Sequence, residues 1–158
     1  MPEGLTLFNQ LDIQFHNTKP LFQVKQTVTQ SVTNNTVTTV AFDTVVYDSH
    51  SGFNNITDTY TVQVAGWYWV SVLLEYQTNS TGIRTVRVNQ NGTGSSLLIH
   101  TMTPNAAGNS AGCYMTGPIK CAIGDTIKIE TVQTSGGALG TQVTGGYINS
   151  FSLDWMHR

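Results

Sequence analysis

The segment Asp48-Ser49-His50-Ser51 contains the three residue types of a serine hydrolase triad. A triad requires a histidine that contacts both the serine and the aspartate. If the preceding strand continues through this segment, Asp48 and His50 share one face while Ser49 points to the other. The spacing therefore favours a polar turn over a catalytic centre.

Other residues capable of chemistry are few and scattered. The four histidines show none of the short spacings that are typical of zinc ligands: His16, His50, His100 and His157. The nine acidic residues offer few candidates for an acid–base pair, and none flanks an obvious nucleophile. No glycine-rich phosphate loop of the Walker or dinucleotide type is present. We therefore expect a protein that is not an enzyme and uses no cofactor.

Calcium is the one metal for which the acidic residues provide candidate ligands. The carboxylates of Asp43, Asp48 and Asp58, with oxygens around Asn54 and Asn55, are of the type that calcium prefers. Asp and Asn at strand ends equally accept hydrogen bonds from nearby backbone N–H groups. We favour these turn contacts over a calcium site.

The stretch 60–76 is apolar on two faces. From Trp67 onward, alternation places Trp67, Trp69 and Leu73 on one face. The opposite face carries Tyr68, Val70, Val72 and Leu74. Tryptophan rings can stack on sugars, but a strand with two apolar faces needs a second burial surface. Because no helix is predicted to cover it, we expect Trp67, Trp69 and Leu73 to lie in a subunit interface.

The sequence that contains these residues is typical of strands and turns. Charged residues make up 10% of the 158, well below the usual quarter, which argues against exposed helices. Ten segments have strand character: 21–28, 36–42, 44–47, 59–64, 66–76, 83–89, 96–102, 111–122, 125–133 and 146–155. The sequence thus predicts a single all-β domain, a β-sandwich or barrel.

Two further segments complete the organisation. Residues 1–20 alternate poorly, end at Lys19-Pro20, and are predicted to form an attachment arm outside a head domain of residues 21–158. The apolar side chains of this arm are Leu5, Leu7, Phe8, Leu11, Ile13 and Phe15. The segment 134–146 is rich in Gly and Thr and is predicted to be a long loop of the kind that binds partners.

Cys113 and Cys121 fall within one predicted strand. At about 3.3 Å per residue their Cα atoms would lie about 26 Å apart, too far for a disulfide. We predict two free, buried thiols, as expected for a protein assembled in a reducing cytoplasm.

Charge and hydropathy exclude two classes of partner. The formal charge of −2 provides no basic surface for nucleic acid. No run of 18 apolar residues could span a membrane, and the N-terminus lacks the basic start and apolar core of a signal peptide.

An ordered series of short motifs resembles the globular head of complement subcomponent C-one-q, within the tumour-necrosis-factor-like (TNF-like) jelly-roll superfamily. The motifs are Phe42-Asp43, Tyr47-Asp48, Gly52-Phe53, Tyr60, Ala65-Gly66-Trp67-Tyr68, Arg87 to Gly92, Ile123-Gly124-Asp125 and Ser150-Phe151-Ser152-Leu153. The resemblance implies a ten-stranded jelly-roll β-sandwich that assembles as a homotrimer. Val70 replaces an aromatic of that family, and the sequence lacks a Gly-X-Y collagen stalk, a signal peptide and an evident disulfide. It is most similar to the stalkless heads on bacteriophage virion proteins.

The leading functional hypothesis is a non-enzymatic virion structural protein. It would be a trimeric capsid decoration or cement protein, or a head-fibre knob, bound through its arm to the major capsid protein or another virion protein. The alternative is a tip module of a phage tail or bacterial surface protein that binds a host glycan or receptor. Loops 78–82, 103–112 and 134–146 would then contact the ligand. The expected location is the virion, assembled in the host cytoplasm.

Overall fold

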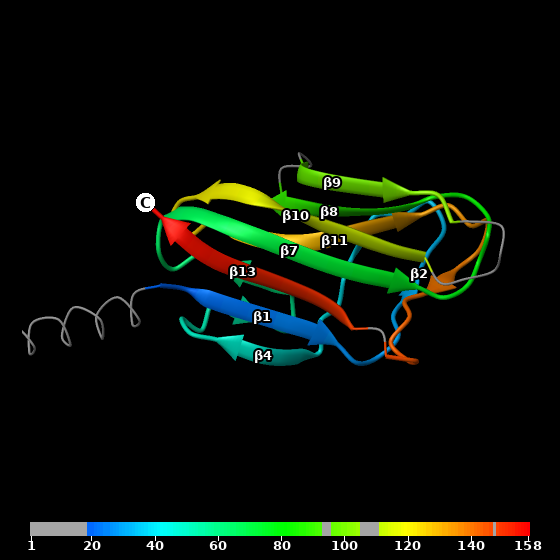
Figure 1. The fold of residues 1–158 in the computed structure, drawn as a ribbon, viewed down its shortest axis with the longest axis horizontal. Helices are drawn as coiled ribbons and strands as arrows, with labels where there is room; N and C mark the ends of the chain where they lie inside the picture. Colours follow the sequence, from blue (N-terminus) through cyan, green and yellow to red (C-terminus); the bar gives the residue numbers. More distant parts are fainter. Residues whose placement is uncertain (1–18, 93–95, 105–110, 147) are drawn as a thin grey trace, which may run out of the picture.

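The computed structural model describes residues 19–92, 96–104, 111–146 and 148–158. These residues form thirteen strands and no helix, and thus no helix that could cross a membrane (Figure 1). The apolar residues of the predicted arm, Leu5, Leu7, Phe8, Leu11, Ile13 and Phe15, lie outside the described residues.

Two antiparallel sheets form the sandwich. The first has the order β10 (Ala111–Cys121), β7 (Gly66–Tyr76), β13 (Asn149–His157), β1 (Leu21–Gln26) and β4 (Thr44–Asp48). The second has the order β5 (Phe53–Asn54), β6 (Thr59–Thr61), β11 (Thr126–Gln133), β8 (Arg84–Gln90) and β9 (Ser96–Met102), with β3 (Thr38–Thr39) on β11. A short pair, β2 (Ser31–Val32) and β12 (Leu139–Gly140), closes one end.

The core lies between the sheets and is built by strict alternation. In β7, the side chains of Tyr68, Val70, Val72 and Leu74 are buried, while their neighbours point outward. An aromatic cluster fills the centre, where the centre of the Phe22 ring lies 4.6 Å from the centre of the Tyr60 ring and 5.2 Å from that of the Phe151 ring. The predicted division of β7 into two faces is confirmed, as is the jelly-roll β-sandwich.

Each predicted strand overlaps an observed one, and β7 and β9 have the predicted bounds. The sequence missed β2, β5 and β12, because two-residue strands are too short to show a period. The segment 134–146 was predicted to be a long loop, but it contains β12, and Leu139 is buried. This part of the chain is therefore tied into the sandwich.

Cys113 and Cys121 are free and buried at the two ends of the inward face of β10, as predicted. Burial is the main cause that raises the pKa of each thiol to about 12. Both thiols are therefore protonated at neutral pH, and a protonated thiol is a poor nucleophile.

We expect Ellman's reagent at pH 8 to react slowly with the native protein and to count two thiols per chain after denaturation without reductant. An Ile99→Cys variant is the control, because this exposed position on β9 should react at once. Fewer than two thiols in denaturant, or rapid reaction of the native wild type, would contradict the assignment.

Candidate functional site

The outward face of the first sheet carries large apolar side chains that the described chain leaves uncovered. We call it the aromatic face and define it by Tyr47, Trp67, Trp69, Leu73 and Tyr114. Trp69 is 40% exposed and Tyr114 is 58% exposed. All five side chains come from β4, β7 and β10 of one sheet, which lies at the front in Figure 1. The three residues predicted for a subunit interface, Trp67, Trp69 and Leu73, thus lie on one surface.

Strand register arranges this face in rows. In one row Trp69 is opposite Pro118 on β10 and Asp154 on β13, and Asp154 is in turn opposite Leu21 on β1. In the row that includes Leu73, Tyr114 lies on one side of it and Ser150 on the other, with Lys25 on β1 opposite Ser150. The face is therefore apolar across several strands, not along β7 alone.

A row of small polar side chains separates these two rows. Ser71 lies between Thr116 and Ser152, and Ser152 is opposite Gln23. The Ser71 and Thr116 hydroxyls are 3.2 Å apart, and the Thr116 hydroxyl donates to the Val70 carbonyl at 2.9 Å. The face thus has a shallow polar band bounded by Trp69 on one side and by Tyr114 and Leu73 on the other. Such relief allows a complementary surface to interdigitate with it.

Two charged residues lie beside the tryptophans: Lys120 on the edge strand β10, opposite Trp67, and Asp154 on the central strand β13, opposite Trp69. The Lys120 ammonium is 6.0 Å from the centre of the Trp67 ring, within the range of a cation–π contact. Burial raises the pKa of Asp154, which is half-buried beside Trp69. Burial, with a smaller contribution from the charge of Asp154, raises the pKa of Tyr47. Charged side chains are few beside the aromatic residues of this face, which favours contact with another apolar surface.

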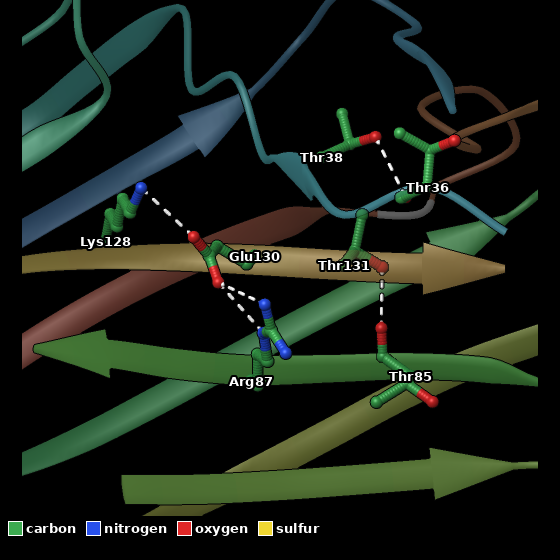
Figure 2. A network of polar contacts seen from close by, with 7 residues as sticks. All are labelled: Thr36, Thr38, Thr85, Arg87, Lys128, Glu130 and Thr131. Atoms are coloured by element: carbon green, nitrogen blue, oxygen red, sulfur yellow. Dashed lines mark hydrogen bonds and ion pairs between the residues drawn. The ribbon is translucent and has the colours of Figure 1, made fainter. Parts of the chain in front are cut away.

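The outward face of the second sheet has a different character. Figure 2 shows Glu130 on β11 between Arg87 and Lys128, with nitrogen–oxygen distances of 2.8 and 3.0 Å. These polar groups satisfy one another within the chain. The aromatic face is therefore the better candidate for an interface.

One end of the sandwich carries a loop held by a buried arginine. Arg84 Nη1 donates to the carbonyls of Thr81 and Ile83, and Nη2 donates to that of Asn79, each at 3.0 Å. Its guanidinium lies 5.7 Å from the centre of the Tyr76 ring. The predicted ligand-binding loop 78–82 is thus held in place from beneath. Sequence reasoning missed Arg84, although in its strand it alternates in phase with the buried Val86 and Val88.

A buried glutamine orders the neighbouring segment 134–146 in the same way. Gln133 Nε2 donates to the carbonyls of Val32 and Gly137, at 2.9 and 2.7 Å. Its Oε1 accepts a hydrogen bond from the Ser135 backbone N–H at 2.7 Å. The third predicted loop, 103–112, lies mostly outside the described residues. Two of the three loops therefore present fixed backbone at this end.

The segment Asp48 to Ser51 corrects one expectation. Ser49 was expected to point away from His50, but its hydroxyl lies 2.8 Å from His50 Nδ1, because the chain turns here and strand alternation ends. Asp48 accepts hydrogen bonds from the backbone N–H groups of His50 and Phe53, not from the imidazole. The histidine therefore lacks the aspartate contact that a triad requires.

The residues considered as calcium ligands are engaged in turns. Asp43 accepts hydrogen bonds from the backbone N–H groups of Thr27 and Val28, each at 2.8 Å. Asp58 accepts one from Phe42 N–H at 2.9 Å. Asn54 Oδ1 accepts one from the backbone N–H of Ile56. Within the described ranges, no group of three or more His, Cys, Asp or Glu side chains is placed to hold a metal ion.

No protein-family model and no curated protein matches the sequence. Solved structures are similar in fold, including the following three. The globular domain of the zebrafish complement 1qA protein has a TM-score of 0.63 and 19% identity, over 89% of this chain and 99% of that one. Murine APRIL has a TM-score of 0.64 and 16% identity, over 88% and 100%. Eiger TNF from S. frugiperda has a TM-score of 0.62 and 12% identity, over 87% and 91%. The chain has the jelly-roll fold of the complement C1q head and of TNF-like proteins.

Proposed function

We propose that the protein is a non-enzymatic interaction module that assembles as a homotrimer through its aromatic face. The observation that carries this proposal is the exposure of Trp69 and Tyr114 on a sheet whose other face forms the core. Contiguous apolar surface of this kind on a soluble domain is typical of a binding site. The resemblance to trimeric C-one-q-like heads favours a second and third copy of this chain as the occupants.

The relief of the aromatic face supports self-association. Aromatic residues are enriched in interface cores, while Lys, Glu and Asp are depleted there. The rows that contain Trp69 and Leu73 hold two charged residues, Asp154 and Lys25, and burial raises the pKa of Asp154. A stable interface needs about 800 Å² from each partner.

Light scattering after size-exclusion chromatography tests the proposal directly. We expect a mass three times that of the 17.2 kDa chain at micromolar concentration. A stable monomer under these conditions would refute the trimer and, with it, the proposed role of Trp67, Trp69 and Leu73.

The end of the sandwich that carries loop 78–82 and segment 134–146 supports a second part of the function, which is recognition of a partner. Arg84 and Gln133 hold loop 78–82 and segment 134–146 in fixed positions, and a preordered loop loses less conformational entropy on binding. Three copies around one axis would present these loops together, which strengthens weak single contacts through multivalency. We propose that this end contacts a glycan or receptor.

The proposal that residues 1–20 attach the head to a larger particle rests on the sequence. The six apolar side chains of residues 1–20 give more apolar surface than a solvated tail carries, which supports docking onto another protein. We propose that this arm anchors the head to a virion, through a capsid protein. The fold is shared with animal proteins, so it lends no support to a virion over another setting.

Deletion of residues 1–18 tests the anchor. We expect the shortened protein to keep its mass and melting temperature and to lose co-sedimentation with particles of its source. The full-length protein is the control. A fall in melting temperature of about 5 °C or more, which a loss of about 1–2 kcal/mol would cause, would make the arm part of the fold.

A further inference from the structure

One carboxyl group lies on the central strand of the sheet that forms the aromatic face. Asp154 is on β13, and the register places Trp69 of β7 on one side of it and Leu21 of β1 on the other. Beyond Trp69 the same row reaches Pro118 on the edge strand β10. The Asp154 side chain is half-buried, and its carboxylate forms no ion pair or hydrogen bond with the part of the chain that the structure describes. This acid therefore lies among apolar neighbours without a partner of its own chain.

The lysines of this region are not placed to neutralise Asp154. Lys120 lies two strands away on β10, where its ammonium is 6.0 Å from the centre of the Trp67 ring. Lys25 is on the neighbouring strand β1, but two rows away from Asp154. Lys19 precedes β1 and is exposed. Burial raises the pKa of Asp154, as expected for a carboxyl group that has no cation beside it.

A tyrosine and a histidine are the other titratable groups around Asp154. Burial and, to a smaller extent, the charge of Asp154 raise the pKa of Tyr47 on β4, so Tyr47 is a neutral phenol at neutral pH. His157 lies at the end of β13, opposite Trp67, and is exposed, as is Arg158 after it. Histidine side chains change charge between about pH 5 and 8, so an experiment must separate the effect of His157 from that of Asp154.

We propose that Asp154 makes assembly of the trimer pH-dependent, so that acid strengthens the trimer and ionisation of this carboxyl group weakens it. The inference rests on the proposed trimer. Contact through Trp69 would also remove the adjacent Asp154 from water, and burial without a cation disfavours the charged form of a carboxyl group. The pKa of Asp154 is therefore higher in the trimer than in the separate chain. The protonated acid favours assembly, so its stabilisation is complete below the pKa of the separate chain and is lost as the pH rises through the pKa of the trimer.

Sedimentation equilibrium of the full chain at pH 5 and pH 8, at one ionic strength, tests the proposal. We expect the wild-type trimer dissociation constant to be larger at pH 8 by about tenfold or more, because each trimer contains three copies of Asp154. Asp154→Asn replaces the acid with an amide of similar shape that does not ionise, so it should remove most of this difference. His157→Gln is the control and should keep the wild-type pH dependence. Far-UV circular dichroism at both pH values confirms that each variant is folded.

Three outcomes would overturn the inference while the trimer itself stands. The first is a wild-type trimer with equal dissociation constants at the two pH values. The second is an unchanged pH dependence in the Asp154→Asn variant, or its loss in the His157→Gln variant. The third is a tighter trimer at pH 8, which would show that a cation of a neighbouring copy pairs with Asp154. A monomer at both pH values would instead refute the proposed trimer, and this inference with it.

Discussion

Replacing both Trp69 and Leu73 with glutamate should convert the trimer into a folded monomer. In the separate chain Trp69 is 40% exposed and Leu73 lies on the same outward face, so glutamate at either position stays in water. In the trimer each copy would bury two carboxylates without partners. A buried, unpaired charge costs about 3–5 kcal/mol, so even one such charge per chain should weaken association more than a hundredfold. Light scattering gives the mass, and far-UV circular dichroism confirms the fold.

The matched control places the same charges on the opposite sheet. Ile99 is 60% exposed on the outward face of β9, and Thr101 is exposed on the same strand. An Ile99→Glu, Thr101→Glu variant should therefore remain a trimer. If the Trp69 and Leu73 variant also stays trimeric while the wild type is a trimer, another surface forms the interface. If both variants dissociate, added charge alone explains the effect.

The parts of the fold that the sequence predicted are those with long, regular alternation. The bounds of β7 and the division of its two faces follow from a period of two over eleven residues. The same signal located β10 and placed Cys113 and Cys121 on its inward side. In both strands the position of a residue in the alternation predicts the face that its side chain occupies, without knowledge of the rest of the chain.

The features that the sequence missed depend on segments meeting in space. One cavity, of about 500 Å³, forms where Gly66, Lys120 and Arg158, which are distant in sequence, come together at one end of the sandwich. The contact between Ser49 and His50 required the chain to turn, which strand alternation could not anticipate. Rows across the aromatic face require strand order and register, so Tyr114 beside Leu73 was not foreseen.

The alternation of β8 predicts where the Arg84 side chain lies but not that it holds loop 78–82. Alternation alone places it inward with Val86 and Val88, but a buried arginine contradicts the usual rule for charged residues. The structure resolves this conflict, because three backbone carbonyls of the loop 78–82 region surround the guanidinium. The loop therefore depends on a side chain that does not belong to it.

Arg84→Ala should destabilise the protein by about 3–5 kcal/mol, through the loss of charge-assisted hydrogen bonds and the cavity left beside Tyr76. At about 2–4 °C per kcal/mol the melting temperature should fall by about 10 °C. Arg87→Ala is the comparison, since Arg87 lies on the outward side of the same strand and Lys128 still pairs with its partner, the buried Glu130, in that variant, so the loss of stability should be smaller. Calorimetry measures both variants.

Hydrogen exchange distinguishes loss of the loop from general weakening. In the Arg84→Ala variant we expect amides of residues 78–83 to lose protection far more than those of β7 or β11, because the acceptors released by the substitution lie in that loop. Uniform loss of protection would show that Arg84 supports the core alone. Equal melting temperatures for the two arginine variants would show that the buried hydrogen bonds of Arg84 contribute no more than the ion pair of Arg87 with Glu130. If instead the loss is confined to the loop, Arg84 couples the core to the end of the sandwich that we propose binds a partner.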